Sequence, residues 1–270
     1  MANGTLKRAG TFIGGSVYKV RFVGRGRAGS SLSLALEAAG WEIAGHLGRG
    51  DPLARAAQGV DALVIATPDR EVAPVARAVE PEEATVVLHL AGSLGLDSLS
   101  PHPRRASLHP LAPLPGGPAG ARRLASGIFF AVAGDPLAAR MASALGGTPL
   151  EVAEGDRAAY HAAACAASNH LVALMGQVQR LAQALGLPLG AFLPLARAAL
   201  EDVESSGPRG ALTGPAARGD ASTLEAHRLA LAELAGAGRL AAEDLDAHLA
   251  LSALAGRLAG QAELAGARCS

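Results

Sequence analysis

The stretch VGRGRAGSSLSLALEAAGWEIAGHLGRG (residues 23–50) decides the fold of this chain. A short apolar strand runs into Gly24, Gly26 and Gly29, and an alanine- and leucine-rich helix follows near residues 28–39. In a loop that binds the pyrophosphate of a dinucleotide, such glycines allow a tight turn, close approach of the phosphates and close helix packing, in that order. Because 34 of the 270 residues are glycine, the spacing alone is weak, and an ordinary glycine turn is the alternative.

The end of the second strand indicates which dinucleotide this loop would bind. NAD sites usually carry an acidic residue about 20 positions after the glycines, at the end of the second strand. Here that strand runs into His46 and Arg49, and no carboxylate follows at its end until Asp51. An arginine pairs with a 2′-phosphate that a carboxylate would repel, so we expect a preference for NADP(H). A solvated Arg49 is the alternative. The expected cofactor contacts are Gly24, Arg25, Gly26, Arg27, Ala28, Gly29, Arg49, Thr67, Pro68 and Gly92.

Strands and helices alternate through the first half, as in a Rossmann-like, doubly wound parallel sheet. The expected strands are 18–24, 41–47, 61–67, 84–92, 127–134 and 148–153, and the expected helices are 28–39, 52–58, 71–79 and 136–145. The segment 101–123 is so rich in proline and glycine that we expect a long irregular loop rather than a helix.

Helical patterns take over after Glu154. They cover about 156–186, 190–205, 221–236 and 241–265, with an interruption at 205–220. We therefore expect an N-terminal tail (1–17), a Rossmann-like domain (18–153) and an all-α domain (154–270).

Composition excludes several classes of protein. Acidic and basic residues balance at 24 each, so nothing suggests a nucleic acid or an anionic membrane as a partner. Two cysteines, Cys165 and Cys269, without metal-ligand spacing fit a reducing compartment. No apolar run has the length of a signal peptide core or a membrane span. We expect a cytoplasmic protein without a metal site.

Ligands of open parallel sheets lie beyond the carboxyl ends of the strands. Thr67 and Pro68 follow the third strand and are expected to border the cofactor, whereas Asp69 is expected to cap the next helix. Gly92 and Ser93, after the fourth strand, offer backbone amides and a hydroxyl near the same crevice. His89, within that strand, is more simply a hydrogen-bonded core histidine.

Four polar residues fall on one face of the first helix of the second half: His161, Cys165, Ser168 and Asn169. His161 has the chemistry of a general acid near neutral pH, and Ser168 and Asn169 that of hydrogen-bond partners for a carbonyl or carboxylate. The alternative is that these groups satisfy loop carbonyls. Tyr160, beside them, is expected to pack.

Two further candidates lie in loops. His109 precedes Pro110 in the proline-rich segment, where an imidazole faces the nicotinamide or substrate, or else shapes the loop. Arg218 lies in LTGPAARGD (212–220) and suits a substrate carboxylate. Asp220 is expected to cap the following helix, and His227 is a weaker candidate.

A family resemblance runs from residue 18 to the C-terminus. VGRGRAG, ATPD, HLAGS, SLHPL, YHAAACAASNHLVAL and ALTGPAARGD, in that order, resemble a bacterial family with a Rossmann-like domain and a helical domain of unassigned function. The family is related to deazaflavin-dependent NADP reductase, pyrroline-5-carboxylate reductase and ketopantoate reductase. The resemblance implies NADP(H) binding and a helical domain of the 6-phosphogluconate dehydrogenase C-terminal type, which commonly dimerises.

One departure bears on catalysis. Many hydroxyacid dehydrogenases of that superfamily carry a lysine four residues before an asparagine on this helix. Asn169 matches the asparagine, but Cys165 stands at the lysine position, and no lysine follows Lys19. The proton donor must therefore be another residue, with His161 or His109 as the best candidates.

The sequence thus predicts an NADP(H)-dependent oxidoreductase, a homodimer through its helical domain. It would reduce a small carbonyl or imine, such as a 2-oxo acid like ketopantoate or a cyclic imine, in an interdomain cleft. The alternative is a non-catalytic NADP(H)-binding sensor.

Overall fold

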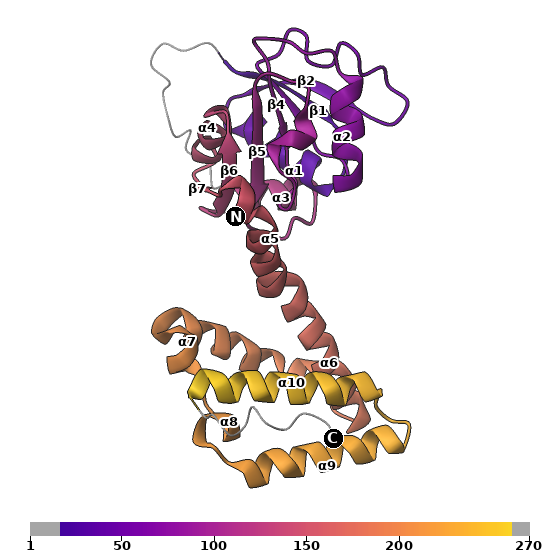
Figure 1. The fold of residues 1–270 in the computed structure, drawn as a ribbon, viewed down its shortest axis with the longest axis vertical. Coiled ribbons are helices and arrows are strands. Elements are labelled where there is room, and N and C mark those ends of the chain that lie inside the picture. Colours follow the sequence, from indigo (N-terminus) through magenta and orange to yellow (C-terminus); the bar gives the residue numbers. More distant parts are fainter. Residues whose placement is uncertain (1–16, 261–270) are drawn as a thin grey trace, which may run out of the picture. The chain divides into compact units, whose positions relative to one another are not determined.

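A computed structural model describes residues 17–260 of the chain. The chain divides into two compact units between Ser168 and Asn169 (Figure 1). Cys269 and the expected tail, apart from Val17, lie outside the described residues.

The first unit is built on a seven-stranded sheet with the order β2-β1-β3-β4-β5-β6-β7. Neighbouring strands are parallel except β5 and β6, which are antiparallel. The expected Rossmann-like sheet is therefore confirmed. The strands are β1 (Lys19–Val23), β2 (Glu42–Leu47), β3 (Ala62–Ile65), β4 (Val86–His89), β5 (Arg105–Pro110), β6 (Phe129–Gly134) and β7 (Thr148–Glu151).

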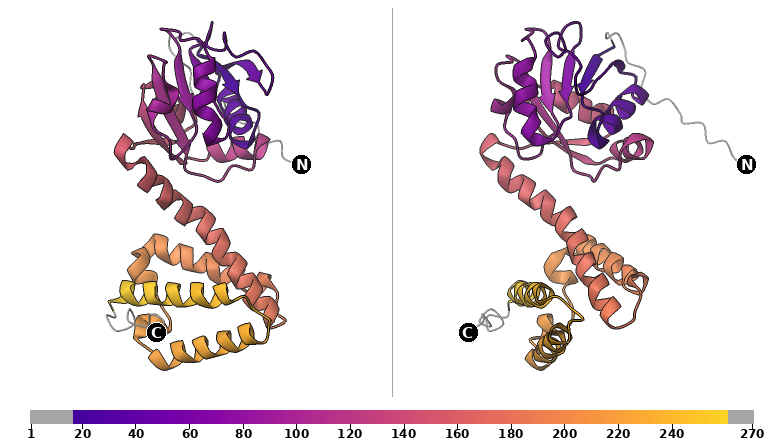
Figure 2. Two further views of the ribbon diagram at one scale, coloured as in Figure 1. Left: turned by 45° about the vertical axis from the view of Figure 1, so that its right-hand side comes forward. Right: turned by 90° about the vertical axis from the view of Figure 1, so that its right-hand side faces the viewer.

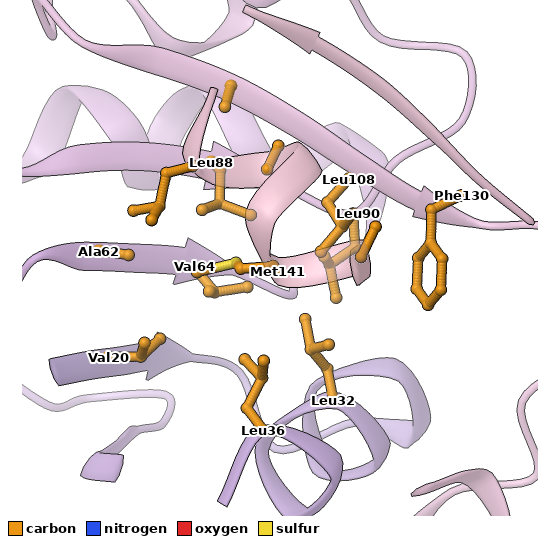
Figure 3. Packing of buried hydrophobic residues seen from close by; sticks show 14 of the residues in the cluster. Val20, Leu32, Leu36, Ala62, Val64, Leu88, Leu90, Leu108, Phe130 and Met141 are labelled. Atoms are coloured by element: carbon orange, nitrogen blue, oxygen red, sulfur yellow. The ribbon is translucent and has the colours of Figure 1, made fainter. Parts of the chain in front are cut away.

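Helices cover both faces of this sheet (Figure 2). They are α1 (Arg27–Ala38), α2 (Asp69–Ala78), α3 (Gly117–Leu124) and α4 (Leu137–Ala144). Helix α5 (Arg157–Cys165) follows the last strand and leads away from the sheet. Because side chains alternate along a strand, each central strand contributes to two cores. Val64 packs in one with Leu36 and Met141 (Figure 3), and Leu63 packs in the other with Val72.

The expected irregular loop at 101–123 is wrong, because this segment holds β5 and α3. Strand β5 pairs with β4 on one side and β6 on the other, and Pro110 stands at its end, where the missing N–H costs least. Helix α3 starts after Gly116 (φ 97°) and places Pro118 in its first turn, where proline is tolerated. Gly120 lets it lie close to α1, since a Cβ there would overlap the Ser31 side chain.

The expected helix at 52–58 is also wrong, since this segment is a series of turns. Several of its backbone carbonyls accept hydrogen bonds from side chains instead of from the backbone N–H groups of an α-helix. Arg21 donates to the carbonyls of Ala56 (2.7 Å) and Gln58 (3.1 Å), and Thr85 donates to that of Ala57 (2.8 Å).

The second unit is helical, as expected. After a π-helical turn at Ala166–His170 come α6 (Leu171–Ala184), α7 (Leu193–Ala211), α8 (Pro215–Arg218), α9 (Ala221–Gly236) and α10 (Ala242–Ala259). Helix α7 is broken at Gly207, which has a φ of 72°. Arg180 on α6 forms a bidentate ion pair with the buried Asp244 on α10 (Nη2 to Oδ1 2.6 Å, Nε to Oδ2 2.9 Å).

Candidate functional site

The glycine loop between β1 and α1 has two tight positions and one open position. Gly24 has a φ of 107°, and a Cβ on it would lie 2.5 Å from the Ala66 carbonyl oxygen. A Cβ on Gly29 would lie 2.9 Å from the Gly24 oxygen. Gly26 has nothing within 4 Å of its Cβ position. The loop is therefore pressed against the end of β3 while leaving open space at Gly26.

The N-terminus of α1 meets this open space with its backbone donors uncapped. Gly26 is the N-cap residue, no side chain caps the helix, and its first turn, beginning at Arg27 and Ala28, contains no acidic residue. The first N–H groups of a helix lack intrahelical partners and carry the positive end of its dipole. Such an end binds phosphate or another anion.

Two arginines and one carboxylate gather where β2 ends. Arg25 donates to the His46 carbonyl (3.0 Å) and lies 3.9 Å from Asp51, while Arg49 is exposed. Asp51 accepts a hydrogen bond from the Gly48 N–H (2.7 Å). The only carboxylate of this group is thus already bonded to the turn, and the guanidinium of Arg49 faces solvent.

Thr67 and Pro68 follow β3, next to the glycine loop. The Thr67 hydroxyl is buried and has no hydrogen-bond partner within residues 17–260, and Pro68 is the N-cap residue of α2. The expectation that Asp69 caps this helix is wrong. Asp69 is the first residue of α2 and accepts a hydrogen bond from the Ser93 hydroxyl (3.2 Å), which ties the ends of β3 and β4 together.

Two imidazoles converge on Gly92, just beyond β4. A Cβ on Gly92 would lie 2.5 Å from His161 Nδ1 and 3.0 Å from His109 Cε1 and Nε2. The two rings lie edge to face, with centroids 5.7 Å apart. His109 comes from β5, not from a loop as expected, and His161 comes from α5. Only glycine fits beneath them.

Each imidazole also contacts a side chain through its other ring nitrogen. His109 Nδ1 lies 2.6 Å from the Tyr160 hydroxyl, and His161 Nε2 lies 3.6 Å from Cys165 Sγ. Tyr160 therefore does more than pack. Burial raises the pKa of Tyr160 to about 12, so its hydroxyl keeps its hydrogen. Burial, followed by the neighbouring His161 and Arg157, lowers the pKa of His109 to about 4, so this ring is neutral at pH 7.

Arg157 and His89 are buried polar residues near the end of β4. The sequence did not single out Arg157, and His89 was expected in the core. Arg157 is 1% exposed and donates through Nη2 to the Ala91 carbonyl (3.2 Å). Its Nε and Nη1, and both ring nitrogens of His89, have no partner in the part of the chain that the structure describes. Burial and Arg157 lower the pKa of His89 to about 4. An isolated arginine has no sequence pattern that indicates burial.

Ser168 and Asn169 lie in the π-helical turn that follows α5. This turn changes the spacing on which their shared face with His161 and Cys165 depended, since that face assumed 3.6 residues per turn. Ser168 donates to the Ala164 carbonyl (2.8 Å). Turns of this kind occur frequently at functional sites.

The remaining candidates lie in the helical unit. Arg218 is the exposed last residue of α8, and His227 contacts His248 edge to face, with centroids 5.7 Å apart. Asp220 caps α9 as expected and accepts a hydrogen bond from the Thr223 N–H (3.1 Å). The role of Arg218 stays a prediction, because it belongs to the second unit.

Within residues 17–260 no three metal-ligating side chains form a cluster. In that range no single helix is long and apolar enough to cross a membrane, although the bent pair 154–184 and 189–218, at 116°, meets the length and composition test together.

Comparison with known proteins places the chain among proteins of this architecture. Residues 128–252, just under half of the chain, match the family model described as a domain of unknown function (DUF2520). No curated protein matches.

Three solved structures share the fold. A Bacteroides fragilis protein provisionally named as an NADP oxidoreductase is 18% identical, with a TM-score of 0.71 over 89% of this chain and 98% of that one. An Aspergillus terreus reductive aminase in complex with NADPH and ethyl-5-oxohexanoate is 16% identical, with a TM-score of 0.63 over 92% and 99%. A Pseudomonas imine reductase is 15% identical, with a TM-score of 0.64 over 93% and 100%.

The resemblance found in the sequence is thus confirmed at the level of the fold: residues 128–252 match DUF2520, and the chain has the architecture of these reductases.

Proposed function

We propose that this protein is an NADP(H)-dependent oxidoreductase that reduces a small carbonyl or imine compound. The observation that carries the proposal is the pair of imidazoles, His109 and His161, over Gly92. Gly92 follows β4, and the glycine loop follows β1, two strands away in the order β1-β3-β4. Parallel strands end at the same edge of a sheet, so donors for a reacting group and a loop for a nucleotide lie at one edge.

The residues of the glycine loop fit the pyrophosphate of a dinucleotide. Gly26 leaves the space that a phosphate needs, and the uncapped N-terminus of α1 supplies backbone donors and a favourable dipole. Arg25, Arg27 and Ala28 adjoin Gly26 in the chain. Thr67 and Pro68 follow β3 beside the same loop, since the Thr67 backbone nitrogen lies 3.3 Å from the Cβ position of Gly24, and they are the proposed wall of the cofactor site. Solved neighbours of this fold hold NADPH, which supports the same cofactor here.

The preference for NADP(H) over NAD(H) rests on the end of β2. Arg49 is exposed there and Arg25 lies beside it, while the carboxylate of Asp51 is bonded to the Gly48 N–H. A guanidinium binds a phosphate through two parallel hydrogen bonds. The 2′-phosphate of NADP(H) is the anion that these arginines suit.

The chemistry divides between cofactor and protein. When bound, NADPH supplies a hydride and leaves as NADP⁺. The protein must orient the acceptor and supply a proton, since no lysine is present after Lys19. His109 and His161 are the proposed catalytic residues, with Ser168 and Asn169 as orienting groups and Arg218 as an anchor for a substrate carboxylate. A 2-oxo acid such as ketopantoate or a cyclic imine would meet these demands.

We also propose a homodimer formed through the helical unit. Its described residues bury few apolar side chains, namely Ala182, Ala184, Ala216 and Leu240. Large apolar side chains are exposed on its helices instead, among them Val172 (72%), Leu195 (70%) and Leu254 (52%). Exposed apolar surface of this extent marks an interaction surface.

The test of the proposed function has two stages. Calorimetry measures NADPH binding to the full chain, and a panel of oxo acids and cyclic imines is then followed by NADPH absorbance. His109→Ala and His161→Ala should lower turnover by about 10²–10⁴-fold, the usual contribution of a positioned proton donor, and leave NADPH affinity unchanged. Tight NADPH binding with no turnover across the panel would favour the sensor alternative.

A further inference from the structure

Arg49 lies at the tip of a tight turn that follows β2. The Asp51 N–H donates to the Gly48 carbonyl (3.3 Å), so residues 48–51 close a β-turn with Arg49 and Gly50 at its centre. Gly50 has a φ of 90°, and no described residue other than glycine has a positive φ. A positive φ at the second central position alone is characteristic of a type II turn, which favours glycine there. The backbone therefore holds Arg49 at the first central position, with its side chain exposed.

The Asp51 carboxylate closes the same turn from the opposite direction. Its Oδ2 accepts a hydrogen bond from the Gly48 N–H (2.7 Å), so two hydrogen bonds join Gly48 and Asp51. A hydrogen bond to a charged acceptor is roughly twice as strong as a neutral one. The Arg49 side chain, by contrast, forms no hydrogen bond or ion pair with any residue between 17 and 260. The carboxylate is thus bonded to the backbone of the turn, and the guanidinium at its tip is unpaired.

Arg25 joins this turn to the glycine loop, to which it belongs. Its Nη2 donates to the His46 carbonyl (3.0 Å) and lies 3.9 Å from Asp51 Oδ2. Its Nε lies 3.7 Å from the position that a Cβ on Gly48 would occupy, so the guanidinium lies against the backbone of the turn. The loop and the turn are therefore fixed to one strand end, and the positive charge of Arg25 offsets that of Asp51.

We infer that Asp51 and Gly50 are positioning residues for the 2′-phosphate of NADP(H), and that Asp51 favours this phosphate although it is an acid. The inference rests on the proposed function and deepens it, because it names residues that determine the choice of cofactor. An acid near the end of the second strand normally holds the ribose 2′-hydroxyl of NAD. Here the carboxylate is bonded to the Gly48 N–H and orders the turn that carries Arg49. A guanidinium on an ordered turn loses less freedom on binding than one on a mobile turn.

The inference predicts a result opposite to that of simple charge repulsion. If Asp51 only repelled the phosphate, every variant without its charge would bind NADPH more tightly than the parent. If the carboxylate orders the turn, loss of the acceptor adds the cost of ordering one long side chain, which corresponds to about two- to tenfold in affinity. Asp51→Asn and Asp51→Ala remove the same charge, and only asparagine keeps an acceptor for the Gly48 N–H. This pair of variants therefore separates positioning from charge.

The first test needs no nucleotide. The full chain is labelled with ¹⁵N, and hydrogen exchange of the Gly48 amide is followed in the parent and in the two Asp51 variants. We expect slow exchange in the parent and in Asp51→Asn and faster exchange in Asp51→Ala, because exchange requires the hydrogen bond to open. The Gly24 amide, which donates to the Leu47 carbonyl (2.8 Å), is an internal control with an unchanged rate. Equal rates at Gly48 in all three proteins overturn the inference.

The second test measures the contribution of the 2′-phosphate. Calorimetry compares adenosine 2′,5′-bisphosphate with adenosine 5′-monophosphate, which differ only in that phosphate, and then NADPH with NADH. Asp51→Ala should bind the bisphosphate and NADPH about two- to tenfold more weakly than Asp51→Asn, and the two variants should bind the monophosphate and NADH equally. Equal binding of NADPH to both variants, or tighter binding to Asp51→Ala, overturns the inference. An equal or larger loss on NADH also overturns it, because Asp51 would then hold the ribose hydroxyl.

Gly50→Ala tests the backbone of the same turn. Nothing lies within 4 Å of its Cβ position, so the methyl group acts only through the φ of 90°. NADPH binding should weaken by about two- to tenfold while NADH binding is kept. Gly59→Ala, at a φ of 68° and in equally open space, is the matched control: it carries a similar backbone strain and should keep the ratio of the two affinities. An unchanged ratio in Gly50→Ala overturns the role of the turn.

The outcomes separate the inference from the proposed function. Binding of NADPH that depends on Asp51 as expected, without turnover of any oxo acid or imine, contradicts the reductase and supports the inference. Turnover of a substrate together with equal NADPH affinities in Asp51→Ala and Asp51→Asn supports the reductase and overturns the inference. Absence of binding of either nucleotide to the parent overturns both.

Discussion

The glycine loop yields a matched pair of substitutions with opposite consequences. Gly24→Ala introduces a Cβ 2.5 Å from the Ala66 carbonyl oxygen at a φ of 107°, and Gly26→Ala introduces one into open space at a φ of −69°. The first should damage the fold, and the second should damage only nucleotide binding. The two residues lie two positions apart in one loop, so each variant is the control for the other.

The magnitudes follow from these geometries. A non-glycine residue in such a backbone region costs about 1–3 kcal/mol, and the contact with the carbonyl adds to this. At about 2–4 °C per kcal/mol for a domain of this size, the melting temperature of Gly24→Ala should fall by about 2–12 °C. Gly26→Ala should be as stable as the parent or about 0.4–1 kcal/mol more stable, because alanine restricts the unfolded chain.

The binding measurement separates the two variants. Calorimetry should show NADPH binding to Gly26→Ala weakened by at least about tenfold, which corresponds to about 1.4 kcal/mol, since the methyl group occupies the space left for phosphate. Thermal unfolding of the same preparations reports the stability. If Gly26→Ala is stable and binds NADPH as tightly as the parent, the pyrophosphate does not lie at this loop. If Gly24→Ala melts with the parent, the close approach to β3 is wrong.

Three further predictions concern the cofactor, the assembly and the pH dependence. Arg49→Ala should weaken NADPH binding by about 1.5–3 kcal/mol, the value of a charge-assisted hydrogen bond, and leave NADH binding unchanged; equal losses in calorimetry would contradict the preference for the 2′-phosphate. Light scattering should give twice the chain mass, and Leu195→Asp should lower it while Leu34→Asp, on α1, should not; a monomeric parent contradicts the proposed dimer. The pKa values of His89 and His109 are lowered from 6.5 to about 4 in the folded protein, so between these values only the unfolded chain takes up the protons. The free energy of unfolding should therefore fall as the pH falls from about 6.5 to 4, and urea titrations that show no slope there would contradict the burial of these rings.

Much of the first unit could be predicted from the sequence because its strands are buried on both faces. Such strands read as short apolar runs, and β3 (ALVI) and β4 (VVLH) are fully buried. The expected helix at 52–58 failed for a tertiary reason. Its carbonyls bond to Arg21 and Thr85, which lie 25 or more residues away in the chain.

Contacts made by single residues that belong to no motif or periodic pattern were the hardest to predict from the sequence. Arg157 is one arginine among many in the sequence, and only the fold brings the first residue of α5 to the chain beyond β4, where its side chain is buried and bonded to the Ala91 carbonyl. The link between Tyr160 and His109 spans 51 residues. The π-helical turn at 166–170 has no sequence signal of its own, yet it changes the face on which Ser168 and Asn169 lie.

The missed strand β5 had the largest consequence for the site. In its register with β4, Ser107 pairs with His89, so His109 lies two residues beyond that pair, level with the chain that leads from β4 to Gly92. If residues 105–110 had been predicted as a strand, His109 would have been placed at the edge of the sheet where the parallel strands end. Its contact with the His161 ring would still have been unknown from the sequence. The prolines and glycines around RASLHP obscured that strand, because they mark its ends rather than its absence. The packing of two imidazoles against one glycine therefore depends on a single strand pairing, between β4 and β5.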